Sequence, residues 1–195
     1  MGMFSRKDMI RLFGPLLVEQ LLAVLVGMAD VVMVAAVGET AVSGVALVDS
    51  ISVLVIQVLS AMATGGAVVC SQYIGKKKPD QACRAAGQLV LITAALSLLI
   101  AAVAFIGNRH LLRLIFGSVE TAVMDNAQTY FWFTAMSYPF LALYNSGAAL
   151  FRSMGNSKVS MKVSLAMNAI NVAGNALCVF GLHMGVEGVA IPTLV

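Results

Sequence analysis

The sequence predicts an all-α integral membrane protein, and three observations support this fold class: the composition, the long apolar runs, and the Lys and Arg residues between them. Of the 195 residues, 60% are hydrophobic and 11% are charged, whereas a soluble domain has about 45–50% apolar and about 25% charged residues. The mean hydropathy is +0.93. This composition excludes an ordinary soluble enzyme, a disordered chain and a nucleic-acid-binding module.

Apolar runs of the length needed to cross a membrane recur along the chain. A hydrocarbon core about 30 Å thick requires about 20 helical residues. Five runs reach this length and a sixth begins near the end of the sequence. The expected helices comprise residues 12–37, 41–73, 85–106, 122–150, 159–182 and 186–195.

The first run is interrupted only by Glu19 and Asp30, and the second only by Asp49. The polar segment GKKKPDQACR then predicts a loop, because it contains a proline and three consecutive lysines. The third run carries no charge. The segment GNRHLLRLIFGSVET that follows it is partly amphipathic, and we expect a connection lying at the membrane interface.

The fourth run contains Trp132 and Pro139, and the basic segment RSMGNSKVSMK separates it from the fifth. The sixth run has only ten residues, which as a helix reach about 15 Å, half the thickness of a bilayer. We therefore expect the sequence to be a fragment or a truncated reading frame.

The distribution of Lys and Arg predicts the orientation in the membrane. Ten of the twelve precede the first helix or lie between helices two and three or four and five, and only Arg109 and Arg113 lie on the other side. Cytoplasmic loops carry an excess of Lys and Arg. We expect a multi-pass protein of the cell (plasma, inner) membrane with a cytoplasmic N-terminus and no nucleic-acid partner.

Polar side chains inside the apolar runs are the candidate functional residues, because a central charge costs roughly 2.5–3.5 kcal/mol on insertion scales. Asp30, Asn175 and Thr193 each lie seven residues from the expected outer end of their helices, or about 10 Å. A carboxylate, an amide and a hydroxyl thus share one depth. Asp49 has a similar depth and is either a second proton carrier or a structural hydrogen-bond partner.

The fifth run places Asn168, Asn171 and Asn175 on one helical face, because they are three and four residues apart. They are either interhelical hydrogen-bonding residues or oxygen ligands for a hard cation such as Na⁺. A proton site needs only the Asp30 carboxylate. For Glu19 we expect contact with a water-filled cavity or, preferably, snorkelling of its carboxylate toward the interface.

No motif of a soluble enzyme is present: there is no Walker sequence, dinucleotide fingerprint, HExxH or GxSxG. The three cysteines show no metal or disulfide spacing. We therefore expect a protein that is not an enzyme and has no cofactor and no metal site beyond one for Na⁺. Active transport by such a chain must be coupled to ions.

Several ordered segments resemble the multidrug and toxic compound extrusion (MATE) family. They are GPLLVEQLLAVLVGMADVVMVAAVG, ATGGAVVCSQYIGKKKPDQA, SYPFLALYNSGAALFRSMGNSKVSM, NAINVAGNALCVFG and GVEGVAIPT. The resemblance covers nearly the whole chain. It implies that residues 1–195 are the six-helix N-terminal lobe of a twelve-helix MATE-type transporter, with the sixth helix truncated and the C-terminal lobe absent. It also implies a secondary antiporter that exports cationic or amphipathic drugs and toxic compounds in exchange for Na⁺ or H⁺.

The resemblance also implies roles for single residues. The coupling aspartate corresponds to Asp30, the proline associated with bending of the first helix to Pro15, and the remaining ligands to Asn171, Asn175, Thr193 and the backbone carbonyl of Val189. Asp49 and Asn168 are additional candidates from their positions. Asn175 is an aspartate in some members, which leaves Na⁺ and H⁺ as alternatives, and Pro192 stands where a small residue is more usual.

The expected partners are small-molecule substrates, the lipid bilayer and a second lobe, supplied by a C-terminal half or by a second copy. A different class of function is a membrane scaffold or degenerate half-transporter without transport activity. A passive channel is the third alternative.

Overall fold

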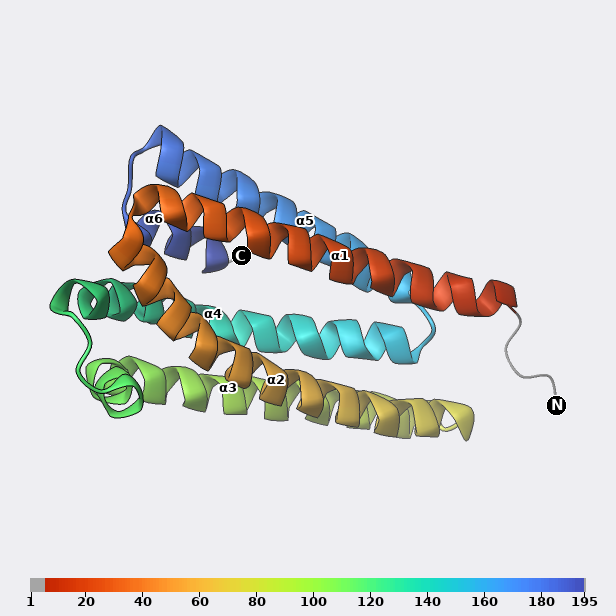
Figure 1. Cartoon of the computed structure of the whole chain (residues 1–195). Helices are drawn as coiled ribbons and strands as arrows, with labels where there is room; N and C mark the ends of the chain where they lie inside the picture. The colour runs from red at the N-terminus through yellow and green to blue at the C-terminus, as the bar shows by residue number, and fades with distance from the viewer. Residues whose placement is uncertain (1–5, 195) are drawn as a thin grey trace.

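Within lipid, a helix is the structure that satisfies every backbone hydrogen bond inside one segment. In the computed structural model, which describes residues 6–194, the chain accordingly folds into long helices joined by short turns (Figure 1). The helices are α1 (Arg6–Val37), α2 (Glu39–Gly75), α3 (Pro79–Phe116), α4 (Thr121–Ser153), α5 (Ser157–Ala176) and α6 (Val186–Ala190). The π-helical segment η1 (Leu177–Gly181) extends α5, and the 3₁₀ segment η2 (Ile191–Leu194) extends α6.

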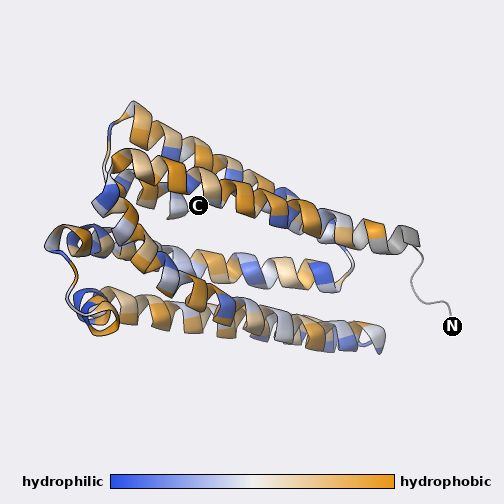
Figure 2. Cartoon of the chain, in the orientation of Figure 1, coloured by the Kyte–Doolittle hydropathy of each residue, from blue (hydrophilic) through white to orange (hydrophobic). Residues whose placement is uncertain are grey.

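Among the described residues, four helical segments are long and apolar enough to cross a membrane: Phe13–Val37, Glu39–Gly75, Pro79–Phe116 and Ser157–Gly181. Hydrophobic residues predominate along them (Figure 2). α4 has 33 residues, about 50 Å, but it is less apolar. The reason is its position, since α2, α3, α5 and α6 all pack against it. Much of its surface therefore faces protein rather than lipid.

α3 is longer than the sequence predicted. It was expected to end at residue 106, but it continues to Phe116, and only residues 117–120 connect it to α4. Gly117 ends the helix with φ 69°, a conformation that glycine adopts without strain, and its N–H donates to the carbonyl of Arg113. The last turns of α3 leave the line of the rest of the helix (Figure 1). Most of the amphipathic segment that was expected as a connection is therefore helical, and its backbone N–H and C=O groups form hydrogen bonds within the helix.

The segment that was expected to form a single helix, the sixth, is divided between α6 and η2. The change to 3₁₀ geometry coincides with Pro192, which has no N–H to donate to a carbonyl one turn earlier. Pro192 is buried and lies directly against Gly174 of α5: a Cβ atom at Gly174 would lie 2.9 Å from the Cβ of Pro192. Because of this close approach, η2 packs directly against α5.

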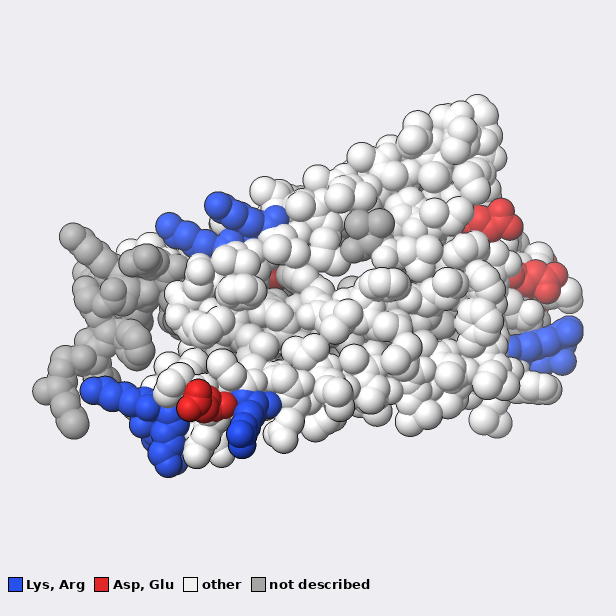
Figure 3. All heavy atoms as spheres, turned by 180° about the vertical axis from the view of Figure 1, so that it is seen from behind, with Lys and Arg blue, Asp and Glu red and all other residues white. Residues whose placement is uncertain are grey.

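The larger hydrophobic core occupies one half of the bundle. Val48, Phe131, Tyr138 and Val189 are among its buried residues, and they join α2, α4 and α6. In the other half, the buried apolar cluster consists of three alanines, Ala63, Ala67 and Ala149. Positive side chains gather at the end of the molecule nearest this alanine cluster, and the middle is almost free of charge (Figure 3).

Buried hydroxyl groups also join the helices. Thr93 of α3 and Ser146 of α4 lie 2.7 Å apart at their oxygens, and the hydroxyls of Ser52 in α2 and Tyr138 in α4 are 3.2 Å apart. Such interhelical hydrogen bonds are worth about 0.6 kcal/mol each on average in membrane proteins. They fix the relative positions of α2, α3 and α4 without adding polar surface toward lipid.

Candidate functional site

Asp30 and Asn175 meet between α1 and α5. The Nδ2 of Asn175 donates to the Oδ1 of Asp30 over 2.8 Å and to the Oδ1 of Asn171 over 3.2 Å. Asn175 is fully buried, whereas Asp30 and Asn171 are partly exposed. The structure thus brings together three of the residues that sequence depth and helical spacing singled out.

The carbonyl oxygen of the Asn175 side chain, Oδ1, is buried and has no hydrogen-bond partner among the described residues. A buried acceptor without a partner costs roughly 1–3 kcal/mol. This acceptor belongs to the residue that contacts Asp30, next to a second amide oxygen on Asn171. Carboxylate and amide oxygens are the ligands that hard cations prefer, so this group of three side chains has the chemistry of a cation site.

A cavity of about 190 Å³ adjoins this group, and Asp30 and Asp49 both line it. Its other walls include Tyr130 and Val189, together with apolar residues of α1 and α2. Two carboxylates that face one cavity repel each other unless a positive charge lies near them. The cavity therefore places Asp49 beside Asp30, as their similar depths in the sequence suggested.

The two candidates from the sixth apolar run differ in position. Val189 is buried and lines the cavity. The Thr193 hydroxyl donates instead to the carbonyl of Ala190 within its own segment, and no hydrogen bond joins it to Asp30 or to the asparagines in the described part of the chain. η2 nevertheless contacts α5.

Asn168 and Pro15 lie away from this group. The Nδ2 of Asn168 donates to the Ser164 hydroxyl over 3.4 Å, so this amide bonds within its own helix. Pro15 lies inside α1, fifteen residues before Asp30, or roughly 22 Å along the helix. It has no N–H to donate to the preceding turn, so the helix lacks one backbone hydrogen bond there.

Tyr130 is a cavity residue that the sequence analysis did not identify. It is 7% exposed, belongs to α4 and lines the same cavity as Asp30 and Asp49. Its spacing of eight residues from the fully buried Tyr138 places both tyrosines on the same inward face of α4. This eight-residue spacing is the sequence pattern from which the inward position of Tyr130 could have been predicted.

The expectation that Glu19 snorkels to the interface is wrong. Its side chain is 16% exposed, and its carboxylate accepts hydrogen bonds from Tyr144 over 2.9 Å, from Arg152 over 3.2 Å and from Ser160 over 3.2 Å. These partners belong to α4 and α5, so Glu19 joins α1 to both helices. Three hydrogen-bond donors inside the bundle replace water as partners of this carboxylate, so it does not extend toward the interface.

The sequence and the fold both match known transporters. Residues 15–177 match the family model MatE. The chain is 30% identical over 190 residues to the uncharacterized transporter YisQ of Bacillus subtilis, covering 95% of this chain and 41% of that protein. It is 26% identical over 196 residues to the probable multidrug resistance protein NorM of Thermotoga maritima, covering 97% and 41%.

The fold is also similar to that of a MOP superfamily transporter from Pyrococcus furiosus. The two structures superimpose with a TM-score of 0.90 at 19% identity, over 96% of this chain and 41% of the other. The chain therefore spans about two fifths of the length of the curated relatives and of the structure that it matches.

Proposed function

The chain belongs to the MatE family, and from this premise we propose that it works as half of a secondary antiporter, exporting drugs and toxic compounds in exchange for Na⁺ or H⁺. It is a multi-pass membrane protein with the fold of a MATE N-terminal lobe. The name of the Thermotoga relative, a probable multidrug resistance protein, supports drugs as substrates, and we propose that these are cationic or amphipathic. In this proposal the chain is a transporter and not an enzyme.

The observation that carries the proposal is the contact of Asp30 with Asn175, whose own Oδ1 is buried without a partner. A bound Na⁺ neutralises Asp30 and supplies a partner for that oxygen. A bound proton neutralises Asp30 but leaves the amide oxygen unpartnered. The unpartnered oxygen therefore favours Na⁺ over H⁺ as the coupling ion.

Either ion removes a net charge from the interior of the lobe, which changes the relative free energies of the arrangements that α1 can adopt. We propose that Pro15 acts as the bending point of α1, because one backbone hydrogen bond is missing there. Asp30 and Pro15 lie on the same helix, so neutralisation at one position and bending at the other are mechanically connected.

The face of α1 that carries Leu17, Leu21 and Met28 is exposed. We propose that a second lobe, from a longer polypeptide or from a second copy, faces this side across the substrate cavity. Inverted or parallel repeats that enclose a site near the bilayer midplane are the general design of secondary transporters. The proposed location is the inner membrane with the N-terminus in the cytoplasm.

Thermal unfolding of the purified chain tests the ion site. Na⁺ at a hundred times its dissociation constant stabilises a binding protein by about 2.7 kcal/mol, which for a chain of this size raises the melting temperature by about 5–10 °C. We expect this rise in NaCl relative to choline chloride of equal ionic strength. We expect it to vanish in Asp30→Asn and to persist in the control Asp80→Asn, which removes an exposed carboxylate at the start of α3.

Equal Na⁺ stabilisation of the wild type and Asp30→Asn would refute the assignment of Asp30. No rise in the wild type would eliminate Na⁺ as the ligand of this site and leave H⁺. Failure of the chain, assembled with its second lobe, to export dyes under either ion gradient would favour a non-transporting scaffold.

A further inference from the structure

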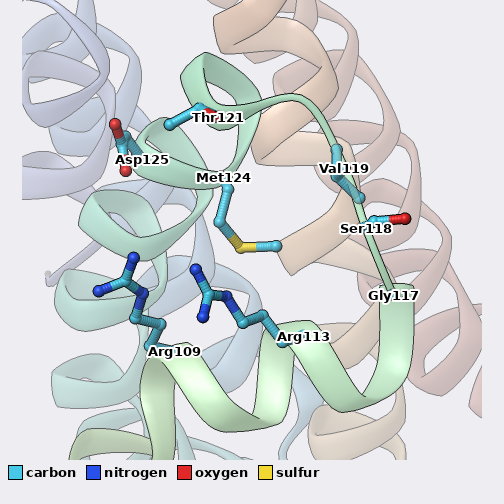
Figure 4. Close-up of a pocket in the computed structure, with 8 residues that line it drawn as sticks. All are labelled: Arg109, Arg113, Gly117, Ser118, Val119, Thr121, Met124 and Asp125. Carbon is cyan, nitrogen blue, oxygen red and sulfur yellow. The ribbon is translucent and has the colours of Figure 1, made fainter.

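Arg109 and Arg113 lie four residues apart on one face of α3. They lie at the end of the molecule opposite the two basic turns, which connect α2 to α3 and α4 to α5. Both side chains extend from the last turns of α3 into a cavity of about 430 Å³ between the ends of α3 and α4 (Figure 4). This volume lies in the range of small-molecule sites, about 300–1,000 Å³. The other Lys and Arg residues whose side chains the structure describes lie in or near the turns between α2 and α3 and between α4 and α5, at the opposite end.

Neither guanidinium forms an ion pair with a carboxylate among the described side chains, whose one ion pair joins Arg152 to Glu19. Asp125 also lines the cavity but lies apart from both guanidinium groups (Figure 4). Two positive charges that enter one cavity repel each other unless an anion lies with them. The arrangement therefore has the charge and the space to bind an anion.

The surroundings of the arginines indicate the membrane–water interface. Ile106 and Leu114, which precede and follow the two arginines in the sequence, are 86% and 83% exposed. Trp132, which is 40% exposed, packs against Phe105 with ring centroids 4.7 Å apart. Tryptophan is enriched at the level of lipid headgroups, and an amphipathic helix end of this kind lies at the boundary between headgroups and acyl chains.

The walls of the cavity are fixed by contacts between the two helices. The Nδ2 of Asn108, next to Arg109, donates to the backbone carbonyl of Gln128 over 2.9 Å. Leu112, between the two arginines in sequence, is fully buried. α3 makes its main contacts with α2 and α4, so it lies at the edge of the bundle.

We propose that Arg109 and Arg113 bind the phosphate group of an anionic phospholipid in this cavity. The guanidinium fork matches phosphate oxygens in a bidentate manner. The exposed side chains of Ile106 and Leu114 distinguish a lipid from free phosphate, because they offer an apolar surface to the acyl chains of the same molecule. The site does not depend on the ion site at Asp30.

Native mass spectrometry of the purified full chain tests this proposal, with phosphatidylglycerol, phosphatidylcholine and inorganic phosphate as probes. Removing two charge-assisted contacts should weaken binding about tenfold or more. We expect this loss for phosphatidylglycerol in the double variant R109Q/R113Q. The matched control K77Q/K78Q removes two exposed charges at the opposite end and should change the affinity less than about twofold.

The variant R109K/R113K retains both charges but loses the planar forks, so it should bind phosphatidylglycerol more weakly than the wild type and more strongly than R109Q/R113Q. If R109Q/R113Q does not fold, this variant and K77Q/K78Q still provide the comparison. Undiminished binding in R109Q/R113Q or R109K/R113K, or an equal loss in K77Q/K78Q, would overturn the proposal. Displacement of the lipid by inorganic phosphate at equal concentration would also overturn it, in favour of a free-phosphate site.

Discussion

The side-chain amide of Asn175 donates hydrogen bonds through its nitrogen, but its oxygen has no hydrogen-bond partner among the described residues. Its Nδ2 donates to Asp30 and Asn171, while its Oδ1 is buried and unbonded. A simple interhelical linker would have both sides satisfied, because a buried polar group without a partner is costly. The unpartnered oxygen supports the proposed ligand role of Asn175 over a role in interhelical hydrogen bonding alone, the two alternatives that the sequence left open.

We predict that Asn175→Ala weakens Na⁺ binding more than it weakens proton-driven transport. A proton needs only the Asp30 carboxylate, whereas Na⁺ loses an oxygen ligand, and one lost charge-assisted contact of about 1.5–3 kcal/mol corresponds to roughly ten- to a hundredfold in affinity. Na⁺-dependent thermal stabilisation of the chain measures the first quantity. Dye efflux by the chain assembled with its second lobe, under an imposed pH gradient, measures the second.

The matched control is Asn168→Ala, on the same helix, because its amide bonds only to Ser164 in the described structure. It should leave the Na⁺ affinity within about twofold of the wild type. The ligand assignment of Asn175 would fail if the two variants lost Na⁺ affinity to the same extent.

At the scale of residues, the sequence predicted the grouping of Asp30, Asn171 and Asn175, because depth and helical spacing follow from position alone. It could not predict the hydrogen-bond direction of the Asn175 amide, which depends on how α1 lies against α5. The same limit explains Glu19. Snorkelling is the sound expectation for a carboxylate near the interface, but donors from α4 and α5 replaced water as its partners.

At the scale of helices, Glu19 joins α1 to α4 and α5 in the half of the bundle whose buried apolar cluster is three alanines. We expect polar contacts to contribute more to helix association there, because this apolar cluster is smaller than the one in the other half of the bundle. We predict that Glu19→Gln lowers the free energy of unfolding by about 1–2 kcal/mol, reduced from the value for a fully buried pair because Arg152 is 37% exposed. Thermal unfolding in detergent measures this change.

The matched control is Glu120→Gln, an exposed carboxylate before α4 that makes no side-chain capping bond. It should change the free energy of unfolding by less than about 0.5 kcal/mol. Equal effects of the two variants would show that the contacts of Glu19 do not stabilise the packing of α1.

The contact between Gly174 and Pro192 gives a second prediction for the helices. A methyl group at Gly174 would lie 2.9 Å from the Cβ of a rigid proline ring, so η2 must move away from α5. We predict that Gly174→Ala destabilises the fold by about 1–3 kcal/mol, as overpacked sites do. At Gly147 of α4 an added Cβ meets nothing within 4 Å, so Gly147→Ala should be neutral or stabilising by up to about 1 kcal/mol. Chemical denaturation curves of both variants measure these changes in the free energy of unfolding, and equal effects of the two variants would contradict the prediction.

At the scale of the whole molecule, the fold class was predictable because the bilayer restricts the chain to helices of a minimum length. The order in which the helices pack was not predictable from apolar runs, since a lipid-facing side and a side facing another apolar helix have the same composition. α4 illustrates this limit. Its small and polar residues, such as Thr134 and Ser146, reflect its contacts with four other helices, which only the structure reveals.

The concentration of positive charge at one end of the molecule (Figure 3) leads to the final prediction, which concerns orientation. In a cysteine-free background, we expect a membrane-impermeant maleimide to label Ser118→Cys from outside intact cells. Lys77→Cys and Lys158→Cys should be labelled only after permeabilisation, because the positive-inside rule places both basic turns in the cytoplasm. All three positions are exposed in the structure, so differences in labelling report the side of the membrane and not burial. The reverse pattern would place Arg109 and Arg113 in the cytoplasmic leaflet, and the proposed phospholipid would then have to come from that leaflet.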